Sequence, residues 1–504
     1  MSKLFVRKLL MLIFLMFLLP TLFAQHRGDN IYFQGLNDIT NLSSVKLIAL
    51  GGTGVGGTSD INSLYTNPAG LSGSSKFQIY IGIGNFESKW WENQDYRPNR
   101  QFVTLPFYLD GMYVPNPENN GEWDNKAFFN DSSYIVSEPK IGPDPYSQDA
   151  ADWVESKDEW ALKNIAVAVP FNFASYNFVF AASYNRNNVW DYDRNQTYLD
   201  PHIGYTGYGY LPERVTSADD SIRINWYDYQ RKRFGEVTQY RFALSSRIND
   251  WIKVGLSATV LSGETDDFLS LNKVGYFDLM GGANKFKFSY DTLNNVNSGV
   301  SEFNSFNVTL GVIFTFRKLD VGLKFDIPSS ITRKYSYENE IYNADINNKT
   351  KTRVEGEDEI DIPLNFAVGI SYRPVEQFRL AIDYELNPYS ESKFALAAQD
   401  TAFSGIPDSY SLRFGIEYQL LDFVELLAGY NTYSELFIPD GAPDKKYGPN
   451  SNAYSFGLGV SIPYGKINIT YAYSILKYYD SYFSNTNYQV RRNQQILLGY
   501  TLVF

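Results

Sequence analysis

QILLGYTLVF, residues 495–504, ends the chain and alternates between two kinds of position. Because successive side chains of a strand point to opposite faces, Ile496, Leu498, Tyr500, Leu502 and Phe504 share one face. The opposite face holds smaller and more polar residues. A strand with these two faces is typical of a wall between lipid and a polar lumen. We expect Tyr500, Leu502 and the terminal Phe504 to be the signal by which barrel-assembly machinery inserts the chain.

The same period of two recurs from Lys76 onward, in segments of about ten residues. Short polar turns such as Asn249-Asp250-Trp251 alternate with long polar connections such as residues 87–162. We count roughly fourteen such segments, the even number typical of bacterial outer-membrane barrels. The sequence therefore predicts an all-β fold, a closed antiparallel transmembrane β-barrel of 14 strands with both termini in the periplasm. A soluble sandwich or propeller would not predict the strict alternation of connection length.

The N-terminus predicts export. Lys3, Arg7 and Lys8 precede the apolar run 9–19, and Ala24 ends a cleavage site, so residues 1–24 have the form of a signal peptide. No other stretch approaches the roughly 20 apolar residues of a membrane helix. Without cysteine, the chain is neither a lipoprotein nor a disulfide-stapled domain. We expect a signal peptide (1–24), an N-terminal plug segment (25–75) and a barrel (76–504) in the bacterial outer membrane.

Composition agrees with a membrane barrel. Aromatic residues make up 17% of the chain, with 40 tyrosines and 36 phenylalanines, as interfacial girdles and a lipid-facing wall require. The net charge of -12 argues against nucleic acid as a partner. The expected surroundings are outer-membrane lipid and lipopolysaccharide.

The segment before the first strand is rich in glycine. Gly52, Gly54 and Gly57 spell GxGxxG, but a dinucleotide site also needs a βαβ unit, which the flanking sequence lacks. Glycine instead suits a tightly turned segment in a confined space. Proline fixes its own backbone angle and asparagine bonds nearby backbone, so Asn67-Pro68-Ala69 predicts a rigid corner. We expect residues 36–73 to plug the lumen, held mainly by backbone and Ser, Thr and Asn hydrogen bonds.

ALGGTGVGG (49–57) and NPAGL (67–71) resemble the N-terminal hatch of the FadL/TodX family of outer-membrane transporters of hydrophobic compounds. Residues 361–385 and 408–430 are similar to that family's paired C-terminal strands. The resemblance implies a plugged barrel that passively takes up a hydrophobic or amphipathic small molecule, such as a long-chain fatty acid or a hydrocarbon. PorV-type barrels share the glycine-rich start, so a docking or scaffold role in a protein complex, through the long loops, stays the alternative.

The predicted register turns several charges into the lumen. The basic ones are Arg241, Arg247, Lys253, Lys324, Arg379 and Arg413, and acidic residues lie among them. Two interpretations stay open at this stage. The charges are solvated or mutually paired in a wet barrel, or some of the cations bind the carboxylate of an anionic amphiphile.

Two features of the first strands and loop stand out. The tryptophans at 90, 91, 123, 153 and 160 predict either a surface that captures an apolar ligand or one that a partner protein covers. Pro170 lies inside the second predicted strand, where it cannot donate to the ladder, so we expect a local break in pairing. That break is either a bulge near the turns or a sideways opening.

The chain has few of the histidines that catalytic sites commonly use. The only histidines are His26 and His202, and a serine hydrolase needs a base beside its nucleophile. We expect no enzyme, no cofactor and no metal site. The acidic run 355–361 and the pair Asp266-Asp267 predict solvated loop charges, with calcium binding as the alternative.

Overall fold

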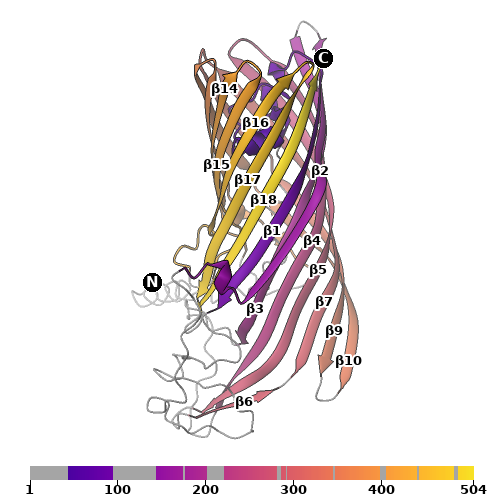
Figure 1. Cartoon of the computed structure of the whole chain (residues 1–504). Helices are drawn as coiled ribbons and strands as arrows, with labels where there is room; N and C mark the ends of the chain where they lie inside the picture. Colours follow the sequence, from indigo (N-terminus) through magenta and orange to yellow (C-terminus); the bar gives the residue numbers. More distant parts are fainter. Residues whose placement is uncertain are drawn as a thin grey trace, which may run out of the picture.

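The computed structural model describes residues 44–94, 144–173, 176–200, 221–280, 285–290, 292–343, 347–397, 405–439, 442–481 and 486–504, so the predicted signal peptide lies outside the described residues. The described residues form one antiparallel sheet that closes on itself (Figure 1). The long strands are β1 (Gln78–Gln94), β2 (Trp153–Phe173), β3 (Tyr176–Asp200), β4 (Ser221–Arg247), β5 (Ile252–Met280), β7 (Leu293–Thr315), β8 (Leu319–Asp326), β9 (Ser329–Asn343), β10 (Asn348–Ile362), β11 (Asn365–Val375), β12 (Phe378–Asn387), β14 (Ser409–Leu421), β15 (Val424–Ser434), β16 (Asn450–Ile462), β17 (Gly465–Ser481) and β18 (Thr486–Val503).

Two strands of the wall each consist of two successive segments, β8 with β9 and β10 with β11. β8 and β9 are interrupted at Ile327-Pro328, and β10 and β11 at Pro363-Leu364, because proline has no N–H for the ladder. Two short strands, β6 (Lys285–Tyr290) and β13 (Phe394–Ala395), pair only with β5 and β10. The wall therefore has the 14 strands that the sequence predicted. β1 pairs with β18 from Gln78–Val503 to Gln94–Asn487 and closes the barrel.

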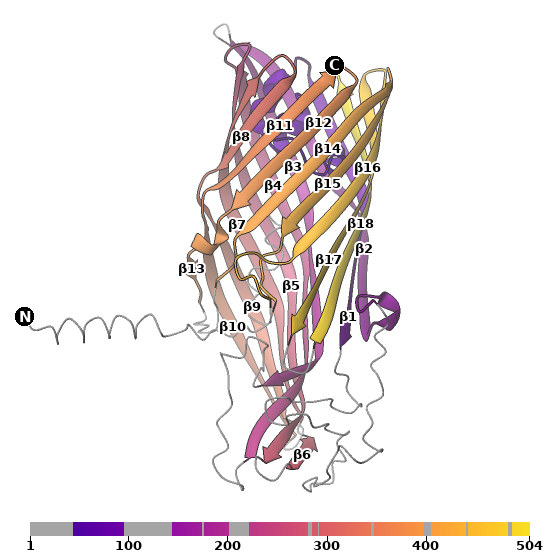
Figure 2. The same cartoon turned by 90° about the vertical axis from the view of Figure 1, so that its left-hand side faces the viewer.

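The two ends of the barrel differ. The short turns and the C-terminus lie at one end, here named the turn end, which is at the top of Figure 1. At the opposite, loop end, one side of the wall continues much further, since β5 has 29 residues and β12 has 10 (Figures 1 and 2). The predicted ten-residue segments were too short for this side, because the strands run on into the predicted loops. There both faces carry polar residues, and the period-two signal disappears.

A belt of apolar side chains faces outward around the barrel. Its exposed members are Ile81, Ile165, Phe180, Phe242, Leu256, Leu310, Ile370, Ile382, Ile416, Leu426, Leu458, Ile469 and Leu498. Exposed aromatic residues edge the belt, for example Tyr240 and Tyr454 toward the loop end and Trp251 and Phe504 toward the turn end. This is the surface that lipid covers in a membrane barrel, with aromatic girdles at its two interfaces. No helix among the described residues is long and apolar enough to cross a membrane.

Inward-facing glycines form a row on the wall. Among the described strands, four pairs of glycines lie opposite each other in register: Gly82–Gly499, Gly255–Gly311, Gly322–Gly369 and Gly415–Gly429. An added Cβ on Gly322 would lie 1.8 Å from the Val55 carbonyl oxygen, and one on Gly429 would lie 1.9 Å from the Gly51 nitrogen. The row therefore leaves room for the chain segment that lies inside the barrel.

Among the described strands, the ladder between β2 and β3 stops part of the way along both strands. β2 pairs with β3 only from Phe173–Tyr176 to Asn164–Asn185. Toward the loop end from there, β2 stays paired with β1 and β3 with β4. The register of the β1–β2 ladder shifts between Gly82 and Ile83, which leaves Lys163 of β2 without an opposite residue, as in a β-bulge.

Side chains close this junction, here named the overlap seam. Trp90 of β1 and Trp153 of β2 pack against Tyr192 of β3, with ring centroids 6.3 and 5.1 Å apart. Tyr192 faces outward from its sheet, whereas Trp90 lies on the lumen side of β1, so β1 and β2 overlap the outer face of β3 and β4. Arg186 of β3 pairs with Glu159 of β2 at 2.7 Å.

Pro170 is not the site of the break that the sequence predicted. The β2–β3 ladder continues without a register shift through the Pro170–Val179 pair. On its other side β2 has no partner at this level, because the β1 ladder ends at Gln78–Ala168. Proline is tolerated here because its missing N–H is not needed beyond the end of β1. The break in pairing lies instead beyond Lys163.

Candidate functional site: a lumenal cavity between the wall and an inner segment

Residues 44–73, here named the inner segment, lie inside the barrel near the turn end (Figure 1). They form α3 (Val45–Ala49) and the 3-10 helices η2 (Ile61–Tyr65) and η3 (Pro68–Gly73). Ser44, Asp60 and Asn67 cap the three helices with their side chains, as such residues do at helix N-termini. The predicted plug residues Gly52, Gly57, Asn67, Pro68 and Ala69 all belong to this segment, whereas residues 36–43 of the predicted plug lie outside the described chain.

The glycines of the inner segment allow its backbone to make tight turns. Gly51, Gly52 and Gly57 have φ angles of 65°, 81° and 96°, a region that side chains with a Cβ rarely adopt. Gly54, the remaining glycine of the GxGxxG pattern, contributes its N–H to a contact with the wall. The conformational role that the sequence suggested is thus visible in the backbone.

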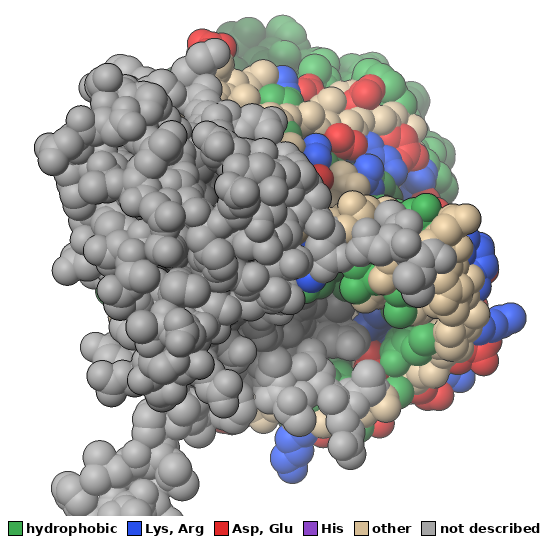
Figure 3. Space-filling model, turned by 90° about the horizontal axis from the view of Figure 1, so that it is seen from below, with side chains coloured by type: hydrophobic (Ala, Val, Ile, Leu, Met, Phe, Trp, Pro, Cys, Tyr) green, Lys and Arg blue, Asp and Glu red, His purple; other side chains and the backbone are tan. Residues whose placement is uncertain are grey.

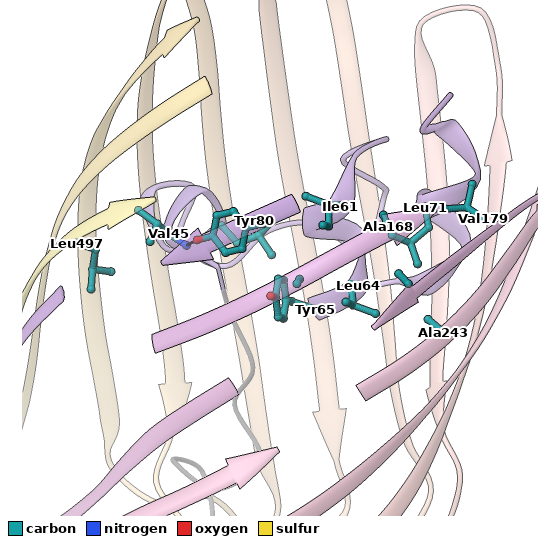
Figure 4. Close-up of a cluster of buried hydrophobic side chains, with 13 residues drawn as sticks. Val45, Ile61, Leu64, Tyr65, Leu71, Tyr80, Ala168, Val179, Ala243 and Leu497 are labelled. Carbon is teal, nitrogen blue, oxygen red and sulfur yellow. Dashed lines mark hydrogen bonds between the residues drawn. The ribbon is translucent and has the colours of Figure 1, made fainter. Parts of the chain in front are cut away.

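Apolar contacts fix one half of the inner segment (Figure 4). Val45, Leu64 and Leu71 are fully buried in a cluster with small wall residues such as Ala168 and Ala243. Val45 also donates its N–H to the Tyr80 hydroxyl at 2.9 Å. Small wall residues let the segment approach closely, and larger ones on the segment fill the space.

Polar anchors fix the other half. Asp383 of β12 accepts hydrogen bonds from the N–H groups of Gly54 and Val55, at 2.6 and 2.9 Å. Asn67 donates from Nδ2 to the Val55 carbonyl at 2.8 Å, and to the carbonyls of Val312 and Leu323 on two wall strands at 3.3 and 3.2 Å. Asn67 therefore fixes the corner between the inner segment and the wall.

Charged groups contribute more to this anchoring than the sequence suggested. Ser455 and Thr470 do donate to inner-segment carbonyls, at 3.1 and 2.9 Å. Lys46, however, lies 3.5 Å from Glu417 and 3.4 Å from Glu425, and its side chain is buried. The expectation that hydrogen bonds mainly hold this segment leaves out these ion pairs, which join Lys46 of the segment to carboxylates of the wall.

A cavity of about 340 Å³ lies between the inner segment and the wall on the loop side. The inner segment contributes Ile48, Gly52, Val55, Tyr65 and Thr66 to its lining. The wall contributes mostly amide and hydroxyl side chains, among them Gln239, Asn307, Asn365, Asn431, Asn493, Ser411 and Ser455. The volume falls in the range of small-molecule sites, roughly 300 to 1,000 Å³.

Three of the six predicted lumenal cations line the cavity. Lys324 lies 3.0 Å from both Asp326 and Glu385, and Arg413 lies 2.6 Å from Glu385. Arg241 differs from them, because its described hydrogen bonds go to neutral atoms, the Thr259 hydroxyl at 2.9 Å and the Leu64 carbonyl at 2.8 Å.

The other three predicted cations lie elsewhere. Arg379 pairs with Glu417 at 2.7 Å and donates to the Gly57 carbonyl at 3.5 Å, so it supports the inner segment. Arg247 shares the strand face of Arg241 but does not line the cavity. It ends β4 at the turn, where it is exposed and pairs with Asp250 at 2.8 Å. Lys253, opposite Arg247 in the ladder, is half-buried and does not line the cavity.

The cavity becomes apolar toward the loop end. Leu261, Ile331 and Ile362 line it there and belong to a buried cluster with Val237 and Phe303. Tyr389, from the 3-10 helix η7 (Tyr389–Glu391), and Ile406 join this cluster from outside the wall strands. The cavity therefore has a polar, charged end at the inner segment and an apolar end toward the loops.

A buried ionic network lies in the loop-end part of the wall. Arg233 pairs with Asp267 at 2.8 Å, and Arg333 pairs with Asp358 at 2.9 Å. Tyr337 donates to Asp267 at 2.6 Å. Burial raises the pKa of Asp267, but Arg233 and the hydrogen bonds outweigh it and hold the pKa below its ordinary value. Asp267 is thus a structural ion-pair residue and not the solvated charge that the sequence predicted.

The outer face of the loop-end strands carries charges of both signs. Figure 3 views this end and shows Lys and Arg side chains beside Asp and Glu on its described part. On β9 and β10, Lys349 pairs with Glu340 at 2.5 Å and Lys334 with Glu357 at 3.8 Å. No cluster of acidic residues with a metal-binding arrangement occurs among the described residues.

The tryptophans of the first predicted loop do not form one exposed surface. Trp90 and Trp153 are buried in the overlap seam, and Trp91 is buried and donates to the Tyr146 carbonyl at 2.9 Å. Trp160 is 67% exposed. Trp123 lies outside the described residues. Extended pairing of β1 and β2 explains the difference, because most of these tryptophans are strand residues.

Sequence reasoning missed some cavity residues. Lys163 lines the cavity because of the shift in the β1–β2 ladder, which no local pattern in the sequence marks. Tyr65 and Thr66 line it from the inner segment. Their position directly before Asn67-Pro68 was the available signal, since a rigid corner fixes the residues that precede it.

Comparison with known proteins supports the architecture. No family model matches the sequence, and no curated protein matches it either. Among solved structures, a Pseudomonas aeruginosa FadL homologue is similar with a TM-score of 0.56 at 14% identity, over 91% of this chain and 98% of that one. The chain has the FadL fold. The toluene transporter TodX of P. putida shares this fold, with a TM-score of 0.54 at 11% identity over 92% of this chain and 99% of that one.

Proposed function

We propose that the chain is an outer-membrane channel for the passive uptake of an amphipathic small molecule. The observation that carries this proposal is the cavity, which has an apolar end and a charged, polar end inside a wall with an apolar outer belt. Solved proteins of the same fold include a toluene transporter and a monoaromatic hydrocarbon channel. The turn end faces the periplasm in this proposal, as short turns do in outer-membrane barrels.

Transport needs a change at the inner segment, which lies between the cavity and the turn end. Besides the buried apolar cluster, the contacts that hold it are separate hydrogen bonds and ion pairs from several strands, such as those of Asp383 on β12 and Thr470 on β17. Each neutral hydrogen bond contributes only about 0.5 to 1.5 kcal/mol net. In this proposal the segment moves locally while the wall stays folded, because the wall strands pair through their own ladders.

Two measurements test the proposal. Liposomes that contain the full chain should take up a fluorescent long-chain fatty acid faster than empty liposomes, without nucleotide or an ion gradient. In planar bilayers, the intact chain should conduct few ions, and a variant without residues 36–66 should conduct freely because the inner segment no longer fills the lumen. Equal uptake with and without the protein would overturn the transport proposal, and equal conductance would show that the inner segment does not close the lumen.

A further inference from the structure

We propose that the cavity receives a hydroxylated head group that carries one carboxylate, such as the sugar acid of an alkyl uronide, with the apolar tail toward the loop end. This inference rests on the proposed function and deepens it by naming the chemical class of the ligand. Three observations carry it: the polar lining of the cavity, one buried cation with neutral partners, and the direction in which the lining changes from polar to apolar.

The lining suits a ligand that forms hydrogen bonds better than it suits a hydrocarbon. Amide side chains such as Asn307 and Asn431 carry both donors and acceptors, and the Ser411 and Ser455 hydroxyls, which donate to Asn431 and to the Ala49 carbonyl, can still accept. Sugar hydroxyls have this same double capacity. A hydrocarbon in contact with these groups would remove their water and return no hydrogen bond, which is unfavourable.

Some buried side chains on the lining have a polar atom without a hydrogen-bond partner among the described residues. Thr66 and Asn365 are each 7% exposed, and Thr66 Oγ1 and Asn365 Oδ1 have no hydrogen-bond partner among the described residues. Buried polar atoms in folded proteins are nearly always bonded to protein, water or ligand. Each of these atoms therefore lacks the bond that a buried polar atom normally makes, and a rotation of its side chain toward the cavity lets a hydroxylated ligand supply it.

Arg241 is the reason why we assign one negative charge to the ligand. It is 8% exposed, and no carboxylate of the described chain lies within ion-pair distance of it, in contrast to Lys324 and Arg413, which share Glu385. Asp326, on the same cavity, is already held by Lys324. A buried cation is unfavourable without a counter-charge, and a guanidinium presents a planar fork that suits a carboxylate.

The ladder gives the orientation of the ligand. Arg241 lies opposite Thr259, and Gln239 lies opposite Leu261, one step further toward the loop end. Arg241 also donates to the Leu64 carbonyl, so it stands at the inner segment. The acid group thus points toward the inner segment, while Leu261 and the apolar cluster receive the tail.

The test is direct binding to the full chain in lipid nanodiscs, with empty nanodiscs as the blank. The probes are hexyl glucuronide (hydroxyls and acid), hexyl glucoside (hydroxyls alone) and heptanoate (acid alone). We expect hexyl glucuronide to bind on the order of tenfold more tightly than either other probe, which corresponds to about 1.4 kcal/mol, because hexyl glucoside lacks the acid and heptanoate lacks the hydroxyls. Heptanoate binding as tightly as hexyl glucuronide would overturn the inference.

Variants of Arg241 separate a binding role from a structural one. Arg241→Gln should abolish the preference for hexyl glucuronide over hexyl glucoside, and Arg241→Lys should keep part of it. Arg353→Gln, at an exposed arginine on β10, is the matched control and should keep the full preference. If Arg241→Gln weakened both glycosides equally, the arginine would be structural and the inference would fail.

The outcome also separates this inference from the function on which it rests. If the fatty acid enters liposomes but hexyl glucuronide does not bind, the inference fails and the transport proposal stands. If no amphiphile enters, the transport proposal fails, and binding of hexyl glucuronide alone would then indicate a receptor.

Discussion

Asp383 holds the centre of the inner segment through one carboxylate oxygen. It is almost fully buried, and Oδ2 accepts from the N–H groups of both Gly54 and Val55. Two backbone N–H groups on one oxygen resemble an anion site in which the protein supplies its own anion. The wall therefore binds the backbone of the inner segment at this point, and this contact does not depend on the side chains of the segment.

Asp383→Asn should loosen the inner segment and leave the barrel folded. Hydrogen bonds to a charged group contribute about 1.5 to 3 kcal/mol each, and an amide replaces the carboxylate with a weaker, neutral acceptor. We expect more frequent ion-conducting events in planar bilayers than the unchanged protein shows. Glu355→Gln, an exposed residue of β10, is the control and should leave conductance as it is. A variant as closed as the unchanged protein would show that Asp383 is dispensable.

For single residues, the sequence predicted which side of the wall a side chain faces better than it predicted which residues the side chain contacts. Period two placed Arg241, Arg379 and Arg413 on the lumen side, where they are. It had no means of showing that Arg379 supports the inner segment while Arg241 stands at a cavity, because both depend on contacts across more than 150 residues of sequence. Arg247 keeps the same parity but lies at the last pair of the β4–β5 ladder, where it is exposed and pairs with Asp250 of the turn.

Several strands are matched to the inner segment through glycines, which have no side chain. Gly415 and Gly429 lie opposite each other on β14 and β15, and the backbone of Leu50 and Gly51 fills the space above them. Glycine weakens a strand in isolation. Its recurrence at one level of the wall therefore reflects close approach of a second backbone.

Gly429→Ala should displace the inner segment, because the added methyl would lie 1.9 Å from the Gly51 nitrogen, and neither backbone can move away cheaply. Gly459→Ala on β16 is the matched control, since its added methyl first meets the flexible end of Lys466 at 2.9 Å. We expect raised conductance and faster protease cleavage within the inner segment for the first variant only. Identical behaviour of the two variants would refute the proposed matching.

The elements themselves were predictable within the apolar belt and not beyond it. The fourteen-strand count followed from the alternation of short and long connections, and the structure confirms it. The extra length of β4 and β5 did not follow, because strands outside the belt have no apolar face to mark them. The shift at Lys163 was also invisible, since a bulge is set by the register of two ladders.

Over the whole molecule, the one-sided extension at the loop end depends on buried ion pairs. Arg233 and Asp267 join β4 to β5, and Arg333 and Asp358 join β9 to β10. Both arginines are almost fully buried. Breaking one partner of such a pair is costly, about 3 to 5 kcal/mol, because it leaves an uncompensated buried charge.

Asp267→Asn should therefore lower the free energy of unfolding of the extension at neutral pH by about 3 to 5 kcal/mol. The pKa of Asp267 in the folded chain lies below its ordinary value, so its contribution is present above the unfolded pKa of about 3.9 and is lost as pH falls through the folded value. Urea unfolding followed by tryptophan fluorescence between neutral and acid pH measures this.

The difference between Asp267→Asn and the unchanged protein should stay constant down to about pH 4 and shrink only below it. Glu338→Gln removes an exposed partner of Lys351 and should cost little at any pH. A difference that disappeared already near neutral pH would mean that Asp267 is protonated in the folded chain and that its pairing with Arg233 is not what stabilises the extension.

A barrel with complete ladders has a fixed circumference, because the number of strands and their stagger set its radius. At the overlap seam, β2 and β3 are joined by ring contacts and by the Arg186–Glu159 pair rather than by a ladder. Aromatic rings slide over one another at small cost, whereas each ladder bond keeps its register. The loop-end half of this barrel can therefore widen or narrow by sliding of β1 and β2 over β3 and β4, while the turn-end half, where a ladder joins β2 to β3, keeps its diameter.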